Sequence, residues 1–198
     1  MYQTNKKATT NCIGIEYLQN AFEPEEIEEL ENNLNKFGIE LKIYSSAPKY
    51  IMGIEELFPQ IQIFLSSDIA QAIYLGIASS AIWDGIKLFF RSLKNIIKKK
   101  TFTHVSNNKV NTKSTPNIHV NIGESHIVLP IDIDDSKFEY FVDKMFDSMD
   151  KDIVNEEKYV FYDAEKQTFE YYTRHEVTMK SYQDWKEKQN SKETTTEE

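Results

Sequence analysis

The stretch DIAQAIYLGIASSAIWDGIKLFFRSLKNIIK, residues 68–98, is the most informative part of this sequence for the fold. Its first half is rich in small residues, and its second half is amphipathic. One face of the second half carries Gly85, Leu88, Phe89, Ser92, Leu93, Ile96 and Ile97. The opposite face carries Asp84, Lys87, Arg91, Lys94 and Lys98. This pattern predicts one long helix that is buried in a protein core.

A membrane helix is the alternative interpretation of the same segment. The uncharged run from Ile69 to Trp83 has 15 residues, whereas a membrane span needs about 20 apolar residues. Asp84 follows at a depth where a charge is costly. The lysines at 98–100 would suit the membrane–water interface, so a single-span or peripheral helix over 68–98 stays open.

The segments on both sides of this helix predict an α+β fold with a mixed or antiparallel sheet. Alternating apolar residues predict strands at 12–18, 39–44 and 61–65. A Glu-rich helix begins at Pro24 and ends at Gly38. A hairpin joins 118–122 to 127–131, a helix with a Ser136/Glu139 capping box follows, and a second hairpin joins 159–163 to 168–173. A short helical turn at 54–58 and a last helix at 179–189 complete the prediction.

The predicted organisation is one domain with a small appendage. Residues 1–10 read as a flexible tail, and residues 11–152 as an α+β domain. The polar, basic stretch 99–117 reads as an exposed loop inside that domain. Residues 153–190 form an aromatic hairpin–helix appendage, and residues 191–198 form a disordered tail.

Composition narrows the compartment and the class of partner. The chain has 198 residues and a net charge of -9, which disfavours nucleic-acid binding because phosphate contacts supply most of that affinity. Its single cysteine, Cys12, excludes an intramolecular disulfide and fits a reducing compartment. The polar N-terminus has no apolar signal segment. We therefore predict a cytoplasmic protein.

Charge is segregated along the chain. From Gly85 to Gly123 there are eight Lys or Arg residues and no acid, between two acidic flanks. Arg91, Lys94 and Lys98 are therefore candidates for contact with an acidic partner protein or an anionic lipid surface. The alternative is a solvated helix face that pairs with the protein's own acidic residues.

Aromatic residues are concentrated in the second hairpin and the last helix. With Asp163 opposite Thr168, Tyr159, Phe161 and Tyr172 share one hairpin face. We predict that these three residues and Trp185 bind another protein or a second copy of the chain, because aromatic residues are enriched at interfaces. Ordinary packing by the terminal helix is the alternative.

No catalytic, metal or cofactor motif is present in the sequence. Nucleophile elbows, phosphate-binding glycine loops and paired metal-ligand spacings are absent. If Ile122 lies opposite Ile127, the backbones of His119 and His126 are about 13 Å apart, which is too far for a shared metal. The acids at 132–135 fit a helix N-terminus better than a cation site. We predict no catalytic, metal or cofactor residue.

The layout from Glu25 to Met149, with small residues around Gly76 and Gly85, resembles the effector-associated constant component families of bacterial conflict systems. That resemblance implies a non-enzymatic protein that links effectors to other parts of a defence system. The favoured function is therefore a bacterial or phage interaction or adaptor component. The alternatives are a membrane-associated protein that uses helix 68–98 and an enzyme with an unrecognised site.

Overall fold

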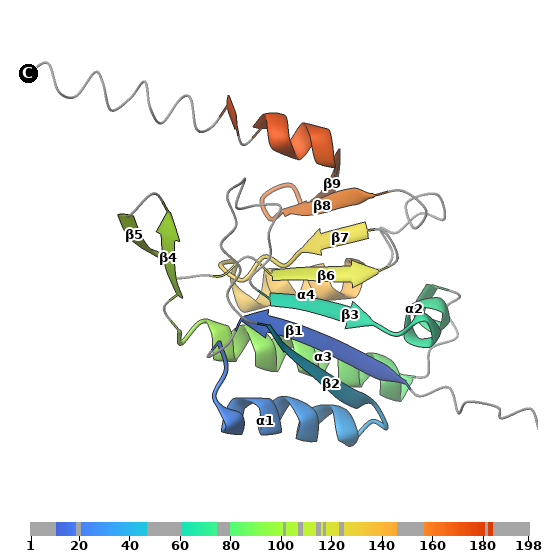
Figure 1. The fold of residues 1–198 in the computed structure, drawn as a ribbon. Coiled ribbons are helices and arrows are strands. Elements are labelled where there is room, and N and C mark those ends of the chain that lie inside the picture. Colours follow the sequence, from blue (N-terminus) through green and yellow to red (C-terminus); the bar gives the residue numbers. More distant parts are fainter. Residues whose placement is uncertain are drawn as a thin grey trace, which may run out of the picture.

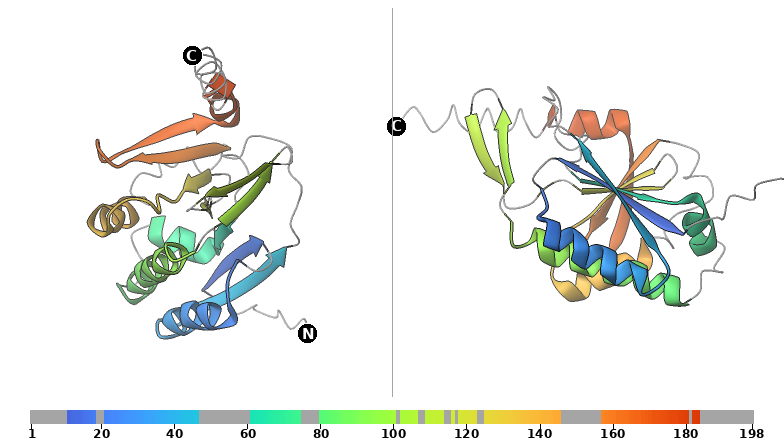
Figure 2. Two further views of the ribbon diagram at one scale, coloured as in Figure 1. Left: turned by 90° about the vertical axis from the view of Figure 1, so that its left-hand side faces the viewer. Right: turned by 60° about the horizontal axis from the view of Figure 1, so that its bottom comes forward.

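Seven strands form a mixed sheet that is covered on one face by three helices, α1, α3 and α4 (Figures 1 and 2). The computed structural model describes residues 11–18, 21–46, 61–74, 80–100, 102–106, 109–113, 116, 118–122, 125–145, 157–180 and 182–183. The strand order is β2-β1-β3-β6-β7-β8-β9. The predicted α+β class with a mixed sheet is confirmed. We refer to the face away from these three helices as the open face.

The first three strands agree closely with the sequence pattern. Strand β1 (Cys12–Leu18) pairs in parallel with β2 (Glu40–Ser46) and antiparallel with β3 (Ile61–Leu65). Helix α1 (Pro24–Asn35) connects β1 to β2. The Glu26 carboxylate accepts a hydrogen bond from the Glu23 N–H at 2.8 Å and so caps the helix start. Gly38 has a φ of 72°, a conformation that favours glycine at a helix end.

The predicted single helix over 68–98 is two separate elements. Helix α2 (Ser67–Tyr74) lies beyond the end of strand β3, and α3 (Ser80–Ile97) crosses behind the sheet (Figure 1). The apolar face of α3 is buried against the sheet through Ile86, Phe89, Phe90, Leu93, Ile96 and Ile97. In the part of the chain that is described, no helix is long and apolar enough to cross a membrane. The burial of its apolar face makes α3 a core helix, as the favoured interpretation expected.

The basic stretch 99–117 is not a featureless loop. Strands β4 (Phe102–Ser106) and β5 (Lys109–Lys113) pair antiparallel as a separate two-stranded sheet. Val105 lies opposite Val110, and Thr103 lies opposite Thr112. Short polar strands of this kind give a weak alternation signal, and for this reason the composition alone suggested a loop.

The C-terminal half continues the same sheet. Strand β6 (Ile118–Ile122) pairs with β3 in parallel and with β7 (Ser125–Val128) antiparallel. Helix α4 (Asp135–Lys144) leads to β8 (Lys158–Asp163), which pairs in parallel with β7, and β9 (Thr168–Thr173) forms the last strand. The aromatic hairpin is therefore an integral part of the sheet, in contrast to the predicted appendage.

Helix α4 begins earlier than its predicted Ser136/Glu139 capping box. The Asp134 side chain accepts a hydrogen bond from the Lys137 N–H at 2.8 Å, so Asp134 is the N-cap residue. The Ser136 hydroxyl donates to the same carboxylate at 2.7 Å. These bonds to the charged form lower the pKa of Asp134. The predicted turn at 54–58 lies outside the described residues.

Gly85 is the point of closest approach between α3 and the α1–β2 corner. A Cβ at this position would lie 2.8 Å from the Phe37 Cβ and 3.1 Å from the Ile39 Cδ1. We expect Gly85→Ala to destabilise the protein by about 1–2 kcal/mol despite the better helix propensity of alanine, because overpacking outweighs it. Chemical denaturation measures the change in the free energy of unfolding.

Gly14 provides the matched control for that substitution. A Cβ on Gly14 would lie 3.4 Å from both Phe64 and Tyr44, which is an ordinary contact. Gly14→Ala should therefore be neutral or stabilising by up to about 1 kcal/mol, because glycine weakens a strand interior. Equal losses in the two variants would contradict the close helix packing described for Gly85.

Candidate interaction surfaces

The register predicted for the second hairpin is confirmed. Asp163 lies opposite Thr168, and the open face of the hairpin carries Tyr159, Phe161 and Tyr172. The rings of Phe161 and Tyr172 are 5.6 Å apart in an edge-to-face arrangement. Tyr159 is buried, and Phe161 and Tyr172 are partly covered. These three predicted partner-binding residues therefore lie together, and ordinary packing covers much of their surface.

A helix over residues 174–180 follows β9 directly and packs against this group. The Thr173 N–H donates to Glu176 Oε2 at 2.7 Å, and the Glu176 N–H donates to Thr173 Oγ1 at 3.3 Å. The Lys180 ammonium lies 4.9 Å from the centre of the Tyr172 ring. The predicted helix began five residues too late because this capping box was missed. Trp185, the fourth predicted aromatic contact, lies outside the described residues.

The opposite face of the hairpin is fixed to the core by α4. Phe141 is fully buried, and its ring lies 5.3 Å from Tyr162 and 5.8 Å from Phe169. Burial raises the pKa of the Tyr162 hydroxyl, since the ionised form would lose hydration. Tyr171, the next residue on this face, is 39% exposed. The face is thus partly buried at Phe169 and solvent-accessible at Tyr171.

Exposed large apolar side chains lie toward the two ends of the strand order, and each group includes residues on both faces of the sheet. One group, which we call the β9 end, comprises Tyr140, Tyr171, Met179 and Tyr182. The other group, the β2 end, comprises Ile43, Tyr44 and Phe64. Because β2 and β9 are the first and last strands of the sheet order, the two groups lie at opposite ends (Figure 1).

The β2 end includes an aromatic pair on the open face. Tyr44 and Phe64 both approach the position that a Gly14 side chain would occupy, at 3.4 Å. Tyr44 is 53% exposed, the highest value among the large apolar side chains described. Lys42 lies beside Gly14 on the same face. Exposed tyrosine beside a backbone floor can contact an apolar partner and hydrogen-bond to it.

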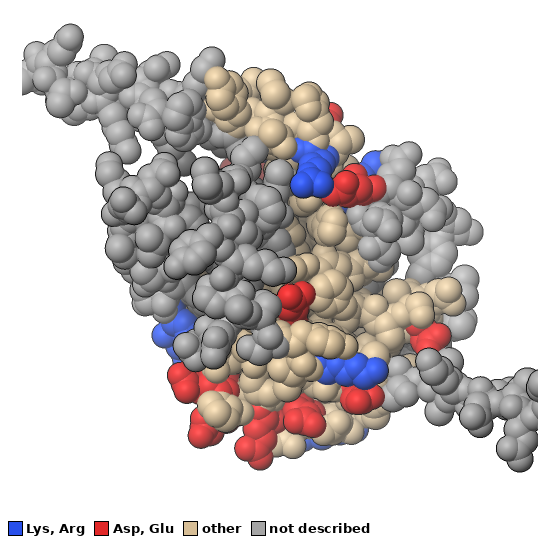
Figure 3. Space-filling model, viewed as in Figure 1, with Lys and Arg blue, Asp and Glu red and all other residues tan. Residues whose placement is uncertain are grey.

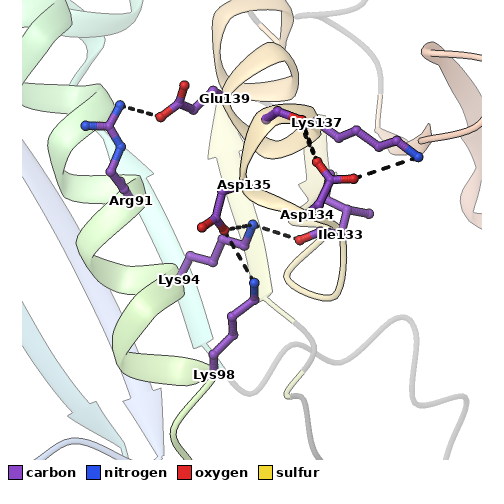
Figure 4. Close-up of polar contacts among 9 residues, drawn as sticks. Arg91, Lys94, Lys98, Ile133, Asp134, Asp135, Lys137 and Glu139 are labelled. Atoms are coloured by element: carbon purple, nitrogen blue, oxygen red, sulfur yellow. Dashed lines mark hydrogen bonds and ion pairs between the residues drawn. The ribbon is translucent and has the colours of Figure 1, made fainter.

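The predicted basic contacts on α3 are bonded to α4 (Figure 4). Arg91 lies 2.7 Å from Glu139, and Lys94 and Lys98 both reach Asp135, at 2.9 and 3.4 Å. The basic face of the helix therefore pairs with the protein's own acidic residues. Arg91 and Lys98 keep part of their surface in solvent, whereas only 1% of the Lys94 side chain is exposed.

Lys94 has a closed set of partners inside the α3–α4 contact. Its ammonium donates to the Ile133 carbonyl at 2.8 Å and to Asp135 Oδ1 at 2.9 Å (Figure 4). It also lies 4.4 Å from the centre of the Phe138 ring. Burial lowers the pKa of Lys94 more than the Asp135 contact raises it. The same contact lowers the pKa of Asp135. Lys94 thus connects two helices within the protein.

Acidic side chains cover the outer surface of α1. Its exposed acids are Glu25, Glu28, Glu29 and Glu31. Figure 3 shows acidic side chains gathered over this helix at the bottom of the view. Lys100 forms an ion pair with Glu26 at 2.5 Å, on the inner side of the group. This surface repels nucleic acid and anionic lipid, and it favours partners with basic surfaces.

The histidine geometry corrects the predicted register of the first hairpin. Val120 lies opposite Ile127, and Asn121 lies opposite His126, so the hairpin is two residues tighter than expected. The rings of His119 and His126 are 6.1 Å apart, and both lie near the Tyr159 ring, at 6.0 and 4.9 Å. The predicted register was wrong, so the argument from it, that the two histidines lie too far apart to share a metal, does not hold.

A hydrogen-bonded chain across three strands orients His126. The side-chain oxygen of Gln62, Oε1, accepts from Asn121 Nδ2 at 3.1 Å, and Asn121 Oδ1 lies 2.6 Å from His126 Nδ1. Because an amide oxygen only accepts, His126 Nδ1 carries a proton in this hydrogen bond. Such orientation suits proton transfer or polar ligand contact. No group of three or more potential metal ligands occurs among the described residues.

Comparison with known proteins gives no relative: no family model matches the sequence, and no curated protein or solved structure matches it significantly. Function is therefore inferred from the surfaces of the chain itself.

Proposed function

We propose that this chain is a non-enzymatic adaptor that binds other proteins at the two ends of its sheet. The observation that carries the proposal is the pair of exposed apolar groups at the β2 end and the β9 end. Exposed aromatic residues on a strand edge are suited to protein contact, because they bury a large area at low entropic cost.

The separation of the two groups supports a linking role. Six strand spacings of about 4.8 Å place β2 and β9 about 29 Å apart across the sheet. Two protein partners can therefore bind without competing for the same residues. Because a continuous sheet joins the two ends, their relative position is held by backbone hydrogen bonds.

Two sequence features agree with this role. The resemblance to effector-associated constant components of bacterial conflict systems implies a protein that connects others. Cys12, the single cysteine, fits the reducing cytoplasm, where we place the activity. The internal pairing of Arg91, Lys94 and Lys98 leaves the aromatic ends as the stronger contacts, and the acidic α1 surface steers basic partners toward the chain.

Site-specific photocrosslinking tests the proposal. A photoreactive phenylalanine replaces Tyr44 at the β2 end or Tyr171 at the β9 end, and a matched control replaces Glu31 on exposed α1. In cells of the source organism we expect distinct crosslinked proteins at positions 44 and 171 and none at position 31. The same products at all three positions, or products at none, would contradict the adaptor function.

A charge substitution then separates the two ends. If a single partner spanned both ends, Tyr44→Lys would also abolish the product captured at position 171. Under the two-ended proposal it removes the β2-end partner and leaves the β9-end partner bound. Co-purification detects the β2-end partner in this variant, because position 44 then carries no photoreactive group. Retention of both partners by Tyr44→Lys would exclude the β2 end as a docking surface.

A further inference from the structure

Strand β9 is an edge strand that lacks the usual protection against pairing. It is the last strand of the sheet, and its six residues pair one-to-one with β8 without a bulge. Its sequence, TFEYYT, contains no lysine, proline or glycine, and its one charged residue, Glu170, accepts a hydrogen bond from the Tyr172 hydroxyl of the same strand. Natural edge strands are commonly protected by such residues or by bulges, because an open edge can pair with another strand.

The opposite edge differs in this respect. Strand β2 carries exposed Glu40 and Lys42, and it pairs with β1 in parallel. Charged side chains on an edge oppose strand addition. Pairing of β2 with β9 of another copy would also be head-to-tail and would give open filaments, whereas β9 with β9 gives a closed dimer. The two edges therefore favour β9 as the self-pairing strand.

We propose that the partner at the β9 end is a second copy of this chain, with the two β9 strands pairing antiparallel about a two-fold axis. This inference rests on the proposed function of the β9 end and names its occupant. The terminal helix lies at one end of β9 and leaves the length of the strand uncovered by described elements (Figure 2). The paired sheets form one continuous sheet, with both helical layers on the same side.

Symmetry and charge select one register. A two-fold axis between antiparallel strands keeps each side chain on the same face of the joined sheet. An odd-numbered residue therefore pairs with an odd-numbered residue of the other copy, and an even-numbered residue with an even-numbered one. If the two-fold axis passed beside Glu170, the two Glu170 carboxylates would lie opposite each other, which is destabilising. A centre at Tyr171 pairs Glu170 with Tyr172 of the other copy and Phe169 with Thr173, so all five residues of 169–173 are used.

The Tyr171-centred register also fits the hydrogen bonds and exposure seen in one chain. The Tyr172 hydroxyl donates to Glu170 Oε2 at 2.7 Å, and a carboxylate can accept a second hydroxyl from the other copy. Tyr171, at the axis, is 39% exposed and lies opposite its own copy. A central aromatic pair with flanking tyrosine–carboxylate contacts is typical of an interface hot spot.

Complementary charges at the symmetry axis test the proposal. Sedimentation equilibrium of the full chain should give twice the 23.2 kDa of one chain. Tyr171→Lys and Tyr171→Glu each place like charges across the axis, so each variant alone should dimerise at least tenfold more weakly. An equimolar mixture of the two variants should recover the dimer, because opposite charges then meet at position 171.

Tyr44→Lys, at the β2 end, is the matched control and should leave the dimer intact. Unchanged circular dichroism and melting temperature show that each variant is folded. A wild-type monomer at 100 µM, or folded Tyr171 variants that do not recover on mixing, would overturn the proposal. A monomer that still crosslinks a different protein at position 171 would refute the second copy and leave the adaptor function standing.

Discussion

Replacing Phe141 with alanine is expected to lower the free energy of unfolding by about 3–5 kcal/mol. Phe141 is fully buried on α4 and contacts the rings of Phe138, Tyr162 and Phe169. The substitution leaves a cavity at the only described aromatic cluster that joins α4 to the β8–β9 hairpin. Urea denaturation measures the loss, and hydrogen exchange should show weaker protection of β8 and β9 than of β1 and β3.

The neighbouring residue on α4 provides the control. Tyr140 is 38% exposed, so Tyr140→Ala should change the free energy of unfolding by no more than about 0.5 kcal/mol. Similar losses in Phe141→Ala and Tyr140→Ala would contradict the packing described for the hairpin. Uniform loss of protection across the whole sheet would show that the hairpin does not unfold separately.

The sequence pattern located both hairpins but determined the register of only one. In the β6–β7 hairpin, pairing Ile127 with Val120 or with Ile122 keeps the same side chains on the helix-covered face. A shift of two residues therefore leaves the apolar alternation unchanged and could not be detected from it. The error placed His119 and His126 far apart, and the structure brings their rings to 6.1 Å.

The division of residues 68–98 into α2 and α3 was also beyond the sequence pattern. Small and apolar residues continue through 75–79, which contain Gly76 but no proline, so the sequence contains only a weak signal for the end of a helix. Tertiary packing decides the outcome, because α3 lies behind the sheet and α2 lies at its end (Figure 1). The amphipathic half, in contrast, was predictable because its apolar residues repeat at helical spacing.

For the candidate interaction surface too, the sequence predicted the features that depend on neighbouring residues and missed those that depend on the tertiary arrangement. Alternation placed Tyr159, Phe161 and Tyr172 on one hairpin face, and the structure confirms this placement. It could not show that β9 is the sheet edge or that the terminal helix covers Tyr172, because both depend on strand order. Tyr171, on the opposite face of the hairpin, is more exposed than Tyr172.

Lys94→Met is expected to keep most of the stability that Lys94→Ala loses. Alanine removes the buried aliphatic chain that fills the α3–α4 contact and should cost about 2–4 kcal/mol. Methionine keeps much of that volume and should cost less than about 1 kcal/mol. The charge adds little net stability, because burial outweighs the partners and lowers the pKa of Lys94. Lys98→Met, at a half-exposed position, is the control and should be nearly neutral.

The pH dependence distinguishes a buried charge from a simple packing effect. Below its lowered folded pKa, Lys94 is protonated in both the folded and the unfolded chain. As pH rises between its lowered folded pKa and the ordinary value of about 10.4, the unfolded chain binds the proton more tightly. Stability relative to Lys94→Met must therefore rise with pH in this window. Titrations shared with the methionine variant, including those of the tyrosines, cancel in the difference between the two urea curves. A difference that falls from pH 7 to pH 10 would show that the ammonium stabilises the helix contact, contrary to the balance of burial and bonding around Lys94.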